Sequence, residues 1–215
     1  MDVPRETINA LAVAAGRDVS RETVDRLGAF VGLLREENGR QNLVSAASLE
    51  DVWNRHIIDS GQLLRLAPDA AESWIDLGTG AGFPGLIVAA LFTGRVTLVE
   101  GRRLRAEFLQ RGADVLGVAE RVRILCAKAE AVDAVPHDVI SARAFAPLDK
   151  LLTIGTRFST SGTCWLLPKG RNAKSELEAA RASWQGEFRL EPSLTDADAQ
   201  IIVASGVSRR GKRAR

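Results

Sequence analysis

The sequence predicts an α/β protein in which helices cover a mostly parallel β-sheet. From Ser73 onward, short β-like runs alternate with helical stretches, which is the pattern of parallel strands joined by crossover helices. Near the C-terminus two β-like runs follow each other with no helix between them, which indicates an antiparallel pair. The chain has 215 residues, of which 46% are hydrophobic and 26% are charged, so it can bury one sizeable core.

Seven strands are expected in this sheet. The sequence pattern places parallel strands at residues 74–77, 95–100, 122–126, 138–142 and 163–167. Between them, residues 84–91, 102–116 and 148–158 are long enough to form right-handed crossover helices. A further helix is expected at residues 172–184, and the antiparallel pair at residues 186–191 and 200–205.

The N-terminal third of the chain shows helical periodicity only. Two amphipathic helices are expected, the second one capped by Ser20, and a third helix is expected to begin at Ser48 and to stop at Pro68. We therefore expect a helical segment at residues 1–70 packed on the core, a ligand-binding domain at residues 71–207, and a basic flexible tail at residues 208–215.

The charge distribution singles out this tail. The formal net charge is +2, but five cations lie between Arg209 and Arg215, so the rest of the chain carries −3. Such an arm can touch phosphate, although an unstructured tail without a partner has the same composition. The sequence leaves both interpretations open.

Composition also excludes several classes of function. The chain has two cysteines and two histidines, too few and too far apart for a disulfide framework or a zinc centre, so we expect two buried thiols and no metal. Its longest uncharged apolar run is far shorter than the roughly 18 residues of a membrane span. We expect a soluble cytoplasmic protein, without a membrane partner, whose chemistry comes from an organic cofactor or from isolated polar groups.

A glycine-rich turn follows the first predicted strand. It reads Asp76-Leu77-Gly78-Thr79-Gly80-Ala81-Gly82-Phe83-Pro84-Gly85 and leads directly into a helix. Glycine permits the backbone angles of a tight turn and lets a ligand lie against the main chain, while the helix N-terminus offers free N–H groups. At the end of the second strand, Glu100 is placed to accept hydrogen bonds from ribose hydroxyls. The pattern predicts a ribose-bearing ligand.

The glycines fit two cofactor classes. Gly80, Gly82 and Gly85 match the G-x-G-x-x-G of dinucleotide enzymes, whereas Asp76, Gly78, Gly80 and Gly82 match the D-x-G-x-G-x-G of S-adenosylmethionine (AdoMet) enzymes. Asp76 favours AdoMet, because a carboxylate there can engage its ammonium group, directly or through water, and would repel a pyrophosphate. The terminal antiparallel pair agrees with the seven-stranded Rossmann-like sheet of class I AdoMet-dependent methyltransferases. The alternative is an NAD-dependent oxidoreductase.

Further motifs resemble a specific family, the bacterial small-subunit rRNA guanine-N7 methyltransferases known as RsmG or GidB. The resemblance covers nearly the whole chain. Besides the glycine loop, the segments that carry it are Asn42-Leu43, Arg55-His56-Ile57-Ile58-Asp59-Ser60, Ala142-Arg143-Ala144-Phe145 and Lys169-Gly170. It implies methyl transfer from AdoMet to N7 of a guanine in 16S rRNA, with the rRNA or the 30S subunit as partner; we expect a monomer.

The resemblance also assigns roles in cofactor binding. It implies that Gly78 and Phe83 line the AdoMet pocket and that Ala129 and Glu130 frame the adenine. Glu100 would hold the ribose. The position of residues 129–130 after the third strand fits a ligand crevice, but it fits an ordinary surface loop equally well.

On the substrate side, the resemblance implies catalytic roles for His56, Asp59 and Arg143. Spacing alone favours a different interpretation, with Arg55 and Asp59 as a surface ion pair and His56 as a half-buried helix residue. Arg143 would reach the cofactor end nearest the substrate and orient the base, while Asp59 would act electrostatically.

Contacts with RNA are expected from residues that follow the fourth and fifth strands. Lys169 and Arg171 could bind phosphate, or could be solvated loop cations. Phe145 is expected to stack on the target base, and the alternative is a hydrophobic plug under its loop. Because guanine N7 carries a lone pair and no proton, the transfer needs positioning and no general base. A third functional class, a non-catalytic rRNA-binding protein, would bind rRNA without transferring a methyl group.

Overall fold

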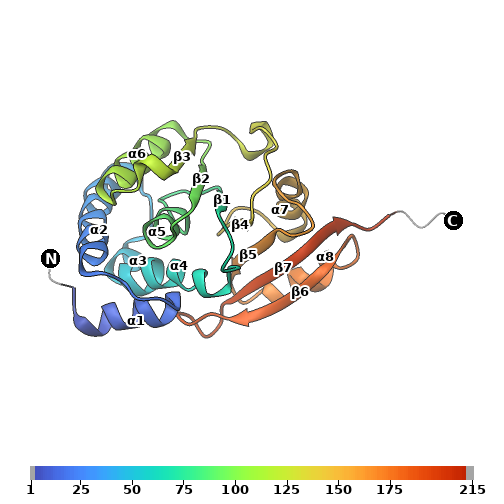
Figure 1. Cartoon of the computed structure of the whole chain (residues 1–215), viewed down its shortest axis with the longest axis horizontal. Coiled ribbons are helices and arrows are strands. Elements are labelled where there is room, and N and C mark those ends of the chain that lie inside the picture. Colours follow the sequence, from blue (N-terminus) through green and yellow to red (C-terminus); the bar gives the residue numbers. More distant parts are fainter. Residues whose placement is uncertain (1–2, 212–215) are drawn as a thin grey trace.

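The predicted seven-stranded mixed sheet is present in the computed structural model, which describes residues 3–211 (Figure 1). The strand order is β3-β2-β1-β4-β5-β7-β6. The first five strands run parallel, and β7 lies antiparallel between β5 and β6. The strands are β1 (Ser73–Leu77), β2 (Arg95–Val99), β3 (Val122–Leu125), β4 (Val139–Ser141), β5 (Cys164–Lys169), β6 (Trp184–Pro192) and β7 (Gln200–Arg209).

Helices cover both faces of the sheet, as the alternating sequence pattern predicts. One face packs against the N-terminal helices together with α5 and α6, and the other packs against α7 and α8. The α-helices are α1 (Arg5–Ala15), α2 (Arg21–Gln41), α3 (Ala46–Glu50), α4 (Asp59–Gly61), α5 (Gly85–Leu91), α6 (Arg103–Val115), α7 (Leu148–Gly155) and α8 (Ala173–Ala180). A π-helix, η1 (Trp53–Ile58), lies between α3 and α4, and short 3₁₀ turns lie at residues 64–66, 119–121, 129–131 and 156–158.

The two faces of the sheet bury two separate apolar clusters. Along β1, Trp74 points into one cluster and Ile75 into the other, because successive side chains of a strand face opposite ways. Leu166 and Leu167 of β5 divide in the same manner. All four side chains are fully buried, so both faces of the sheet are packed and the sheet supports the loops that follow its strands.

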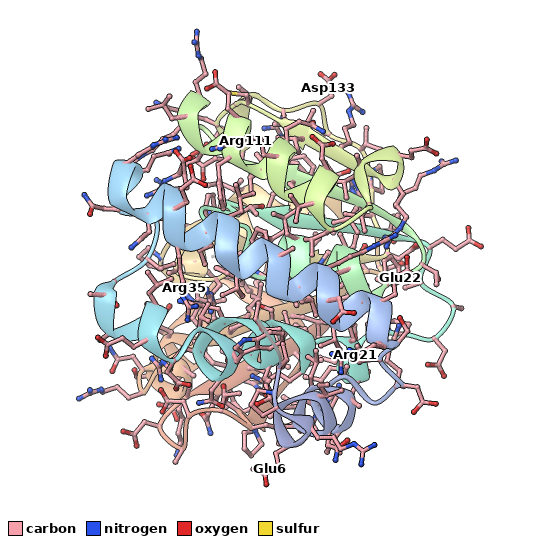
Figure 2. All side chains as sticks on the ribbon, turned by 90° about the vertical axis from the view of Figure 1, so that its left-hand side faces the viewer. Glu6, Arg21, Glu22, Arg35, Arg111 and Asp133 are labelled. Carbon is pink, nitrogen blue, oxygen red and sulfur yellow. The ribbon has the colours of Figure 1, made fainter. Side chains whose placement is uncertain are left out.

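The N-terminal helices are built into the main core. Leu27 and Phe30 of α2 share one apolar cluster with Leu86 of α5 and Phe108 of α6. Glu37 of α2, which is 5% exposed, pairs with Arg111 of α6, whose guanidinium lowers the pKa of that carboxyl group. Figure 2 shows α2 crossing this side of the molecule beside α6. The helical segment is thus held to the sheet by both packing and charge.

Residues 46–61 differ from the single helix that the sequence predicts. The helix begins earlier, because the Ser45 side chain accepts the Ser48 N–H and caps α3. After Asp51 the chain widens into η1, where the Asp59 N–H donates to the Asn54 carbonyl five residues earlier. Of the functional residues predicted here, His56 lies on this π-helix and Asp59 directly follows it.

The C-terminal end also departs from the prediction. Ser208 and Arg209, expected in the flexible tail, belong to β7, and the Arg210 N–H donates to the Ser183 carbonyl. Residues 212–215 of the predicted tail lie outside the described residues. Cys126, predicted to be buried, is exposed at the end of β3, whereas Cys164 is buried. No helix within residues 3–211 is long and apolar enough to cross a membrane.

Candidate functional site

The glycine-rich turn connects β1 to α5 at the carboxyl edge of the sheet, where open α/β folds bind ligands. Gly78 adopts a φ of 70°, which side chains rarely allow. A Cβ atom at this residue would lie 2.3 Å from the Phe145 ring. The main chain at Gly78 therefore lies in direct contact with the loop after β4, and only glycine fits there.

Asp76 is buried beneath the turn and does not reach a ligand surface. Its Oδ2 accepts the Gly85 N–H at 3.1 Å, and its Oδ1 accepts the Ser141 hydroxyl at 2.7 Å. The Trp74 indole in turn donates to Ser141. Asp76 was expected to engage a cofactor ammonium, directly or through water; in the structure its side chain is fully enclosed and holds the start of α5.

We expect the pH dependence of stability to reveal this burial. Desolvation raises the pKa of Asp76 from 3.8 to about 6, so its stabilising contribution is complete below pH 3.8 and is lost as the pH rises through about 6. Between pH 5 and 7.5 the wild type should lose roughly 1–2 kcal/mol more unfolding free energy than Asp76→Asn, which cannot titrate. Urea unfolding at both pH values measures this, and equal pH dependence in the two proteins contradicts it.

Glu100 and the turn form the edge of one cavity. The Glu100 side chain is 6% exposed, and its Oε2 accepts the Gly80 N–H at 3.0 Å while Oε1 accepts the Arg102 N–H at 2.9 Å. The cavity measures about 270 Å³ and is lined by Gly78 and Glu100 together with Ala129 and Glu130 after β3. Four residues predicted to bind cofactor thus meet around one hollow, which we call the acid cavity.

Gly80, Gly82 and Phe83 are not among the residues that line the acid cavity. The N–H of Gly80 holds Glu100, whereas Gly82 packs on Leu86. Phe83, expected to line the pocket, is 3% exposed and packs edge-on against Phe30 of α2. The ring is buried between Phe30 of α2 and His56 of η1, and its contact with a cofactor stays a prediction.

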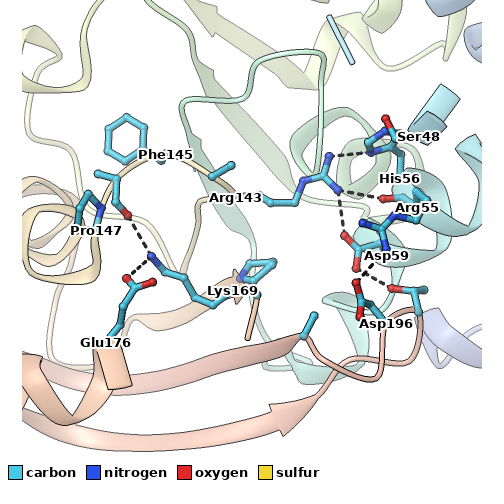
Figure 3. A pocket seen from close by; sticks show the side chains of 16 residues that line it. Ser48, Arg55, His56, Asp59, Arg143, Phe145, Pro147, Lys169, Glu176 and Asp196 are labelled. Carbon is cyan, nitrogen blue, oxygen red and sulfur yellow. Dashed lines mark hydrogen bonds and ion pairs between the residues drawn. The ribbon is translucent and has the colours of Figure 1, made fainter. Parts of the chain in front are cut away.

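A second cavity of about 750 Å³ adjoins the first and shares its Ala144, Phe145 and Ala146 walls (Figure 3). We call it the arginine cavity, because Arg143 projects into its centre. The Nη1 atom of Arg143 donates to Asp59 Oδ2 at 3.0 Å and to the Arg55 carbonyl at 3.2 Å. Its Nη2 donates to His56 Nδ1 at 2.9 Å. The three residues predicted to be catalytic, on two distant segments, form one cluster.

His56 is neutral in this cluster. Burial, followed by the charges of Arg143 and Arg55, lowers the pKa of His56 from 6.5 to about 3. Because the guanidinium donates to Nδ1, the imidazole proton lies on Nε2, which is buried without a hydrogen-bond partner. The ring stacks on Phe83 with a centroid distance of 4.6 Å. His56 thus orients Arg143 and cannot take up a proton near neutral pH.

The surface ion pair that spacing alone favours, Arg55 with Asp59, does not form. Arg55 pairs with Asp196 at 2.9 Å, and Asp59 pairs with Arg143. Each of the two residues takes a partner from a distant segment instead, which spacing along one helix cannot indicate. The predicted proximity of Asp59 to the substrate side is consistent with its place in the arginine cavity.

The predicted RNA-binding residues occupy different environments. Lys169 is largely enclosed and donates to Glu176 Oε2 at 2.9 Å and to the Ala146 carbonyl at 3.0 Å, so it is not the solvated loop cation of the alternative interpretation, and its contact with RNA stays a prediction. Arg171 is exposed. Phe145 is partly buried against Gly78 and lines both cavities, and its stacking on a base stays a prediction.

Sequence reasoning missed several residues that complete the site. Ser141 holds Asp76, Glu176 holds Lys169 and the Leu148 N–H, and Gln62 and Thr195 both bond Asp59. Ser141, directly before the Ala142-Arg143 signature, was within reach of sequence reasoning. Thr195 lies 136 positions from Asp59, and no local pattern indicates that contact. Within residues 3–211 no group of three metal-ligating side chains occurs.

Comparison with known proteins decides the family. The family described as "rRNA small subunit methyltransferase G" (GidB) matches residues 23–200. The chain belongs to this family. The methyltransferase G protein of Rhizorhabdus wittichii is 53% identical over 196 residues, covering 90% of each chain. That of Zymomonas mobilis subsp. mobilis is 49% identical over 197 residues, covering 88% of each.

Solved structures show that this family member has the class I methyltransferase fold. The ribosomal protein L11 methylase of Lactobacillus delbrueckii subsp. bulgaricus superposes with a TM-score of 0.57 at 16% identity, covering 72% of this chain and 78% of the other. An O-methyltransferase from Bacillus cereus, in complex with SAH, superposes with a TM-score of 0.54 at 14% identity, covering 82% and 90%. These likenesses support the fold assignment.

Proposed function

We propose that this family member transfers a methyl group from AdoMet to N7 of one guanine in 16S rRNA, acting on the rRNA or on the 30S subunit. The observation that carries the proposal is the pair of adjoining cavities, one built on Glu100 and the glycine turn and the other on Arg143. One suits the nucleoside of a donor, and the other suits an RNA base.

The residues of the acid cavity fit AdoMet. Glu100 offers a nearly buried carboxylate whose oxygens can each accept another hydrogen bond, as ribose hydroxyls require. The backbone of Gly78 has no side chain to hold a ligand away. Ala129 and Glu130, at the end of β3, would frame the adenine. When bound, AdoMet supplies an electrophilic methyl group on a sulfonium.

The chain's own groups in the arginine cavity account for the rest of the reaction. Guanine N7 uses its lone pair to form the new N–C bond while the S–C bond breaks, and the positive charge moves to the purine. No proton is removed, which agrees with a neutral His56 that cannot act as a base. Arg143 would orient the guanine, and Asp59 would offset the charge that develops on it.

The NAD-dependent oxidoreductase is the weaker candidate. The β6–β7 pair that ends the sheet is typical of methyltransferases, and this sheet is shared with methyltransferases of known structure. Calorimetric titration with AdoMet and with NAD separates the two, since we expect binding of AdoMet only. We also propose that the enzyme works as a monomer, and its mass in solution tests this.

The decisive experiment uses 30S subunits from cells that lack this gene. We expect methyl-tritiated AdoMet to label their 16S rRNA, and nuclease digestion with mass spectrometry to find 7-methylguanosine at one position. Deproteinised 16S rRNA forms a parallel reaction that shows which form is the substrate. Labelling of another atom would overturn the N7 assignment, and RNA binding without transfer would favour the non-catalytic alternative.

A further inference from the structure

The loop between β6 and β7, residues 193–199, forms part of the wall of the arginine cavity. Thr195, Asp196 and Ala199 line that cavity, although β6 is the edge strand of the sheet. The Ser193 N–H donates to the Ala199 carbonyl, and the Ala199 N–H donates to the Asp196 carbonyl, so the loop is closed by its own backbone. It therefore presents its side chains to η1 and α4 in a defined geometry.

Asp59 receives hydrogen bonds on both carboxylate oxygens. Oδ2 accepts from Arg143, whereas Oδ1 accepts from the Thr195 hydroxyl at 2.8 Å and from Gln62 Nε2 at 2.9 Å. The Thr195 hydroxyl must be the donor in this pair, because an ionised carboxylate can only accept. Two neutral donors thus fix the plane of the carboxylate that holds Arg143.

Gln62 of the segment after α4 forms hydrogen bonds with the loop. Its side chain is fully buried; its Oε1 accepts the Leu194 N–H at 2.8 Å, and its Nε2 contacts Ser193 Oγ at 3.2 Å in addition to Asp59. Because the amide donates to Asp59 and accepts from the loop at once, it sets the distance between them. A buried amide with all of these partners is costly to disturb.

The loop also determines which carboxylate each arginine takes. Two guanidinium groups, Arg55 and Arg143, flank His56, and both add to the lowering of its pKa. Asp196 of the loop occupies Arg55, while Asp59 remains with Arg143 (Figure 3). The loop thus supplies Arg55 with a carboxylate of its own.

We propose that Thr195 and Gln62 are positioning residues that hold Asp59, and through it the guanidinium of Arg143, in the orientation needed for methyl transfer. The inference rests on the proposed function, since it concerns the orientation of the group that would hold the guanine. Neither residue faces the acid cavity. Their loss should therefore change turnover and leave donor binding as it is.

The test compares Thr195→Val, which removes the hydroxyl, with Thr195→Ser, which restores it. Asp198→Asn is the matched control, because Asp198 is exposed on the same loop and its side chain makes no hydrogen bond with residues 3–211. We expect Thr195→Val to lower kcat about tenfold with an unchanged AdoMet dissociation constant. Thr195→Ser and Asp198→Asn should keep most of the wild-type turnover.

A spectroscopic measurement reports the orientation without turnover. A guanidinium held by three acceptors should give slowly exchanging Nη signals in NMR spectra, assigned to Arg143 by their loss in Arg143→Lys. These signals should broaden or disappear in Thr195→Val and persist in Thr195→Ser. Gln62→Met, with its melting temperature recorded alongside, should have the same effect wherever the variant is folded.

The outcomes separate this inference from the proposed function. A wild-type protein that never methylates 16S rRNA overturns the function, whatever the variants do. An active wild type together with Thr195→Val of equal turnover and unchanged Arg143 signals overturns the positioning role. In an Arg143→Lys background, Thr195→Val should cost little further turnover, because residues that act through one another are not additive. Full additivity there would also overturn the inference.

Discussion

Replacing Gly78 by alanine is expected to weaken AdoMet binding at least about a hundredfold. At a φ of 70° the alanine backbone costs roughly 1–2 kcal/mol, and its Cβ would stand 2.3 Å from the Phe145 ring, so this ring, which lines the acid cavity, would have to move. Calorimetric titration with AdoMet measures the loss, with the circular dichroism spectrum recorded to confirm folding.

Two companion variants show where that effect comes from. Gly101→Ala is the matched control, because it lines the same cavity, its φ is ordinary, and a Cβ there would have no neighbour closer than 3.8 Å. We expect it to bind AdoMet within a few-fold of the wild type. The double variant Gly78→Ala with Phe145→Ala removes the clash but not the backbone strain or the added Cβ. If this double variant bound AdoMet as tightly as the wild type, the result would contradict a role for the Gly78 backbone in the acid cavity.

Removing the Arg143 side chain should have the largest effect on methyl transfer. Arg143→Ala deprives Asp59 and His56 of their shared donor and leaves a largely enclosed carboxylate unpaired. We expect kcat/KM for rRNA to fall at least about a hundredfold, since positioning and charge stabilisation both depend on this group. Single-turnover transfer from tritiated AdoMet to 30S subunits measures it.

The conservative variant makes this prediction specific. Arg143→Lys keeps the charge but cannot contact the His56 ring, the Asp59 carboxylate and the Arg55 carbonyl in the same planar geometry, so we expect it to remain strongly impaired. Arg171→Ala, an exposed cation nearby, should weaken rRNA binding mildly and leave kcat unchanged. Wild-type kcat/KM in Arg143→Ala would remove this residue from the mechanism.

The arrangement of the sheet was predictable because its signals are local. Each strand shows its own run of apolar residues, and the absence of a helix between β6 and β7 is visible in the chain itself. The π-helix was not predictable, since residues 53–58 have ordinary helical periodicity and the wider turn depends on contacts with other segments. The end of β7 was not predicted, because the basic residues there have the composition of a flexible tail.

The sequence indicated which residues gather at the site better than it indicated which contacts they make there. His56, Asp59 and Arg143 lie together as the family signature implies, and Glu100 lies at the cavity edge that its strand position indicates. Asp76 and Phe83 differ because their side chains point inward, and a motif does not specify side-chain direction at a turn. The Lys169 pairing with Glu176 depends on where α8 packs, which local sequence cannot reveal.

The position of the β6–β7 hairpin has a consequence for the order in which the site forms during synthesis of the chain. β7 is translated after β5 and β6 yet lies between them in the sheet, and the loop before it supplies partners of Asp59 and Arg55. A nascent chain that has exposed the glycine turn and Arg143 therefore still lacks the contacts that fix the guanidinium. The complete set of contacts can therefore form only after the loop at residues 193–199 and β7 have left the ribosomal exit tunnel.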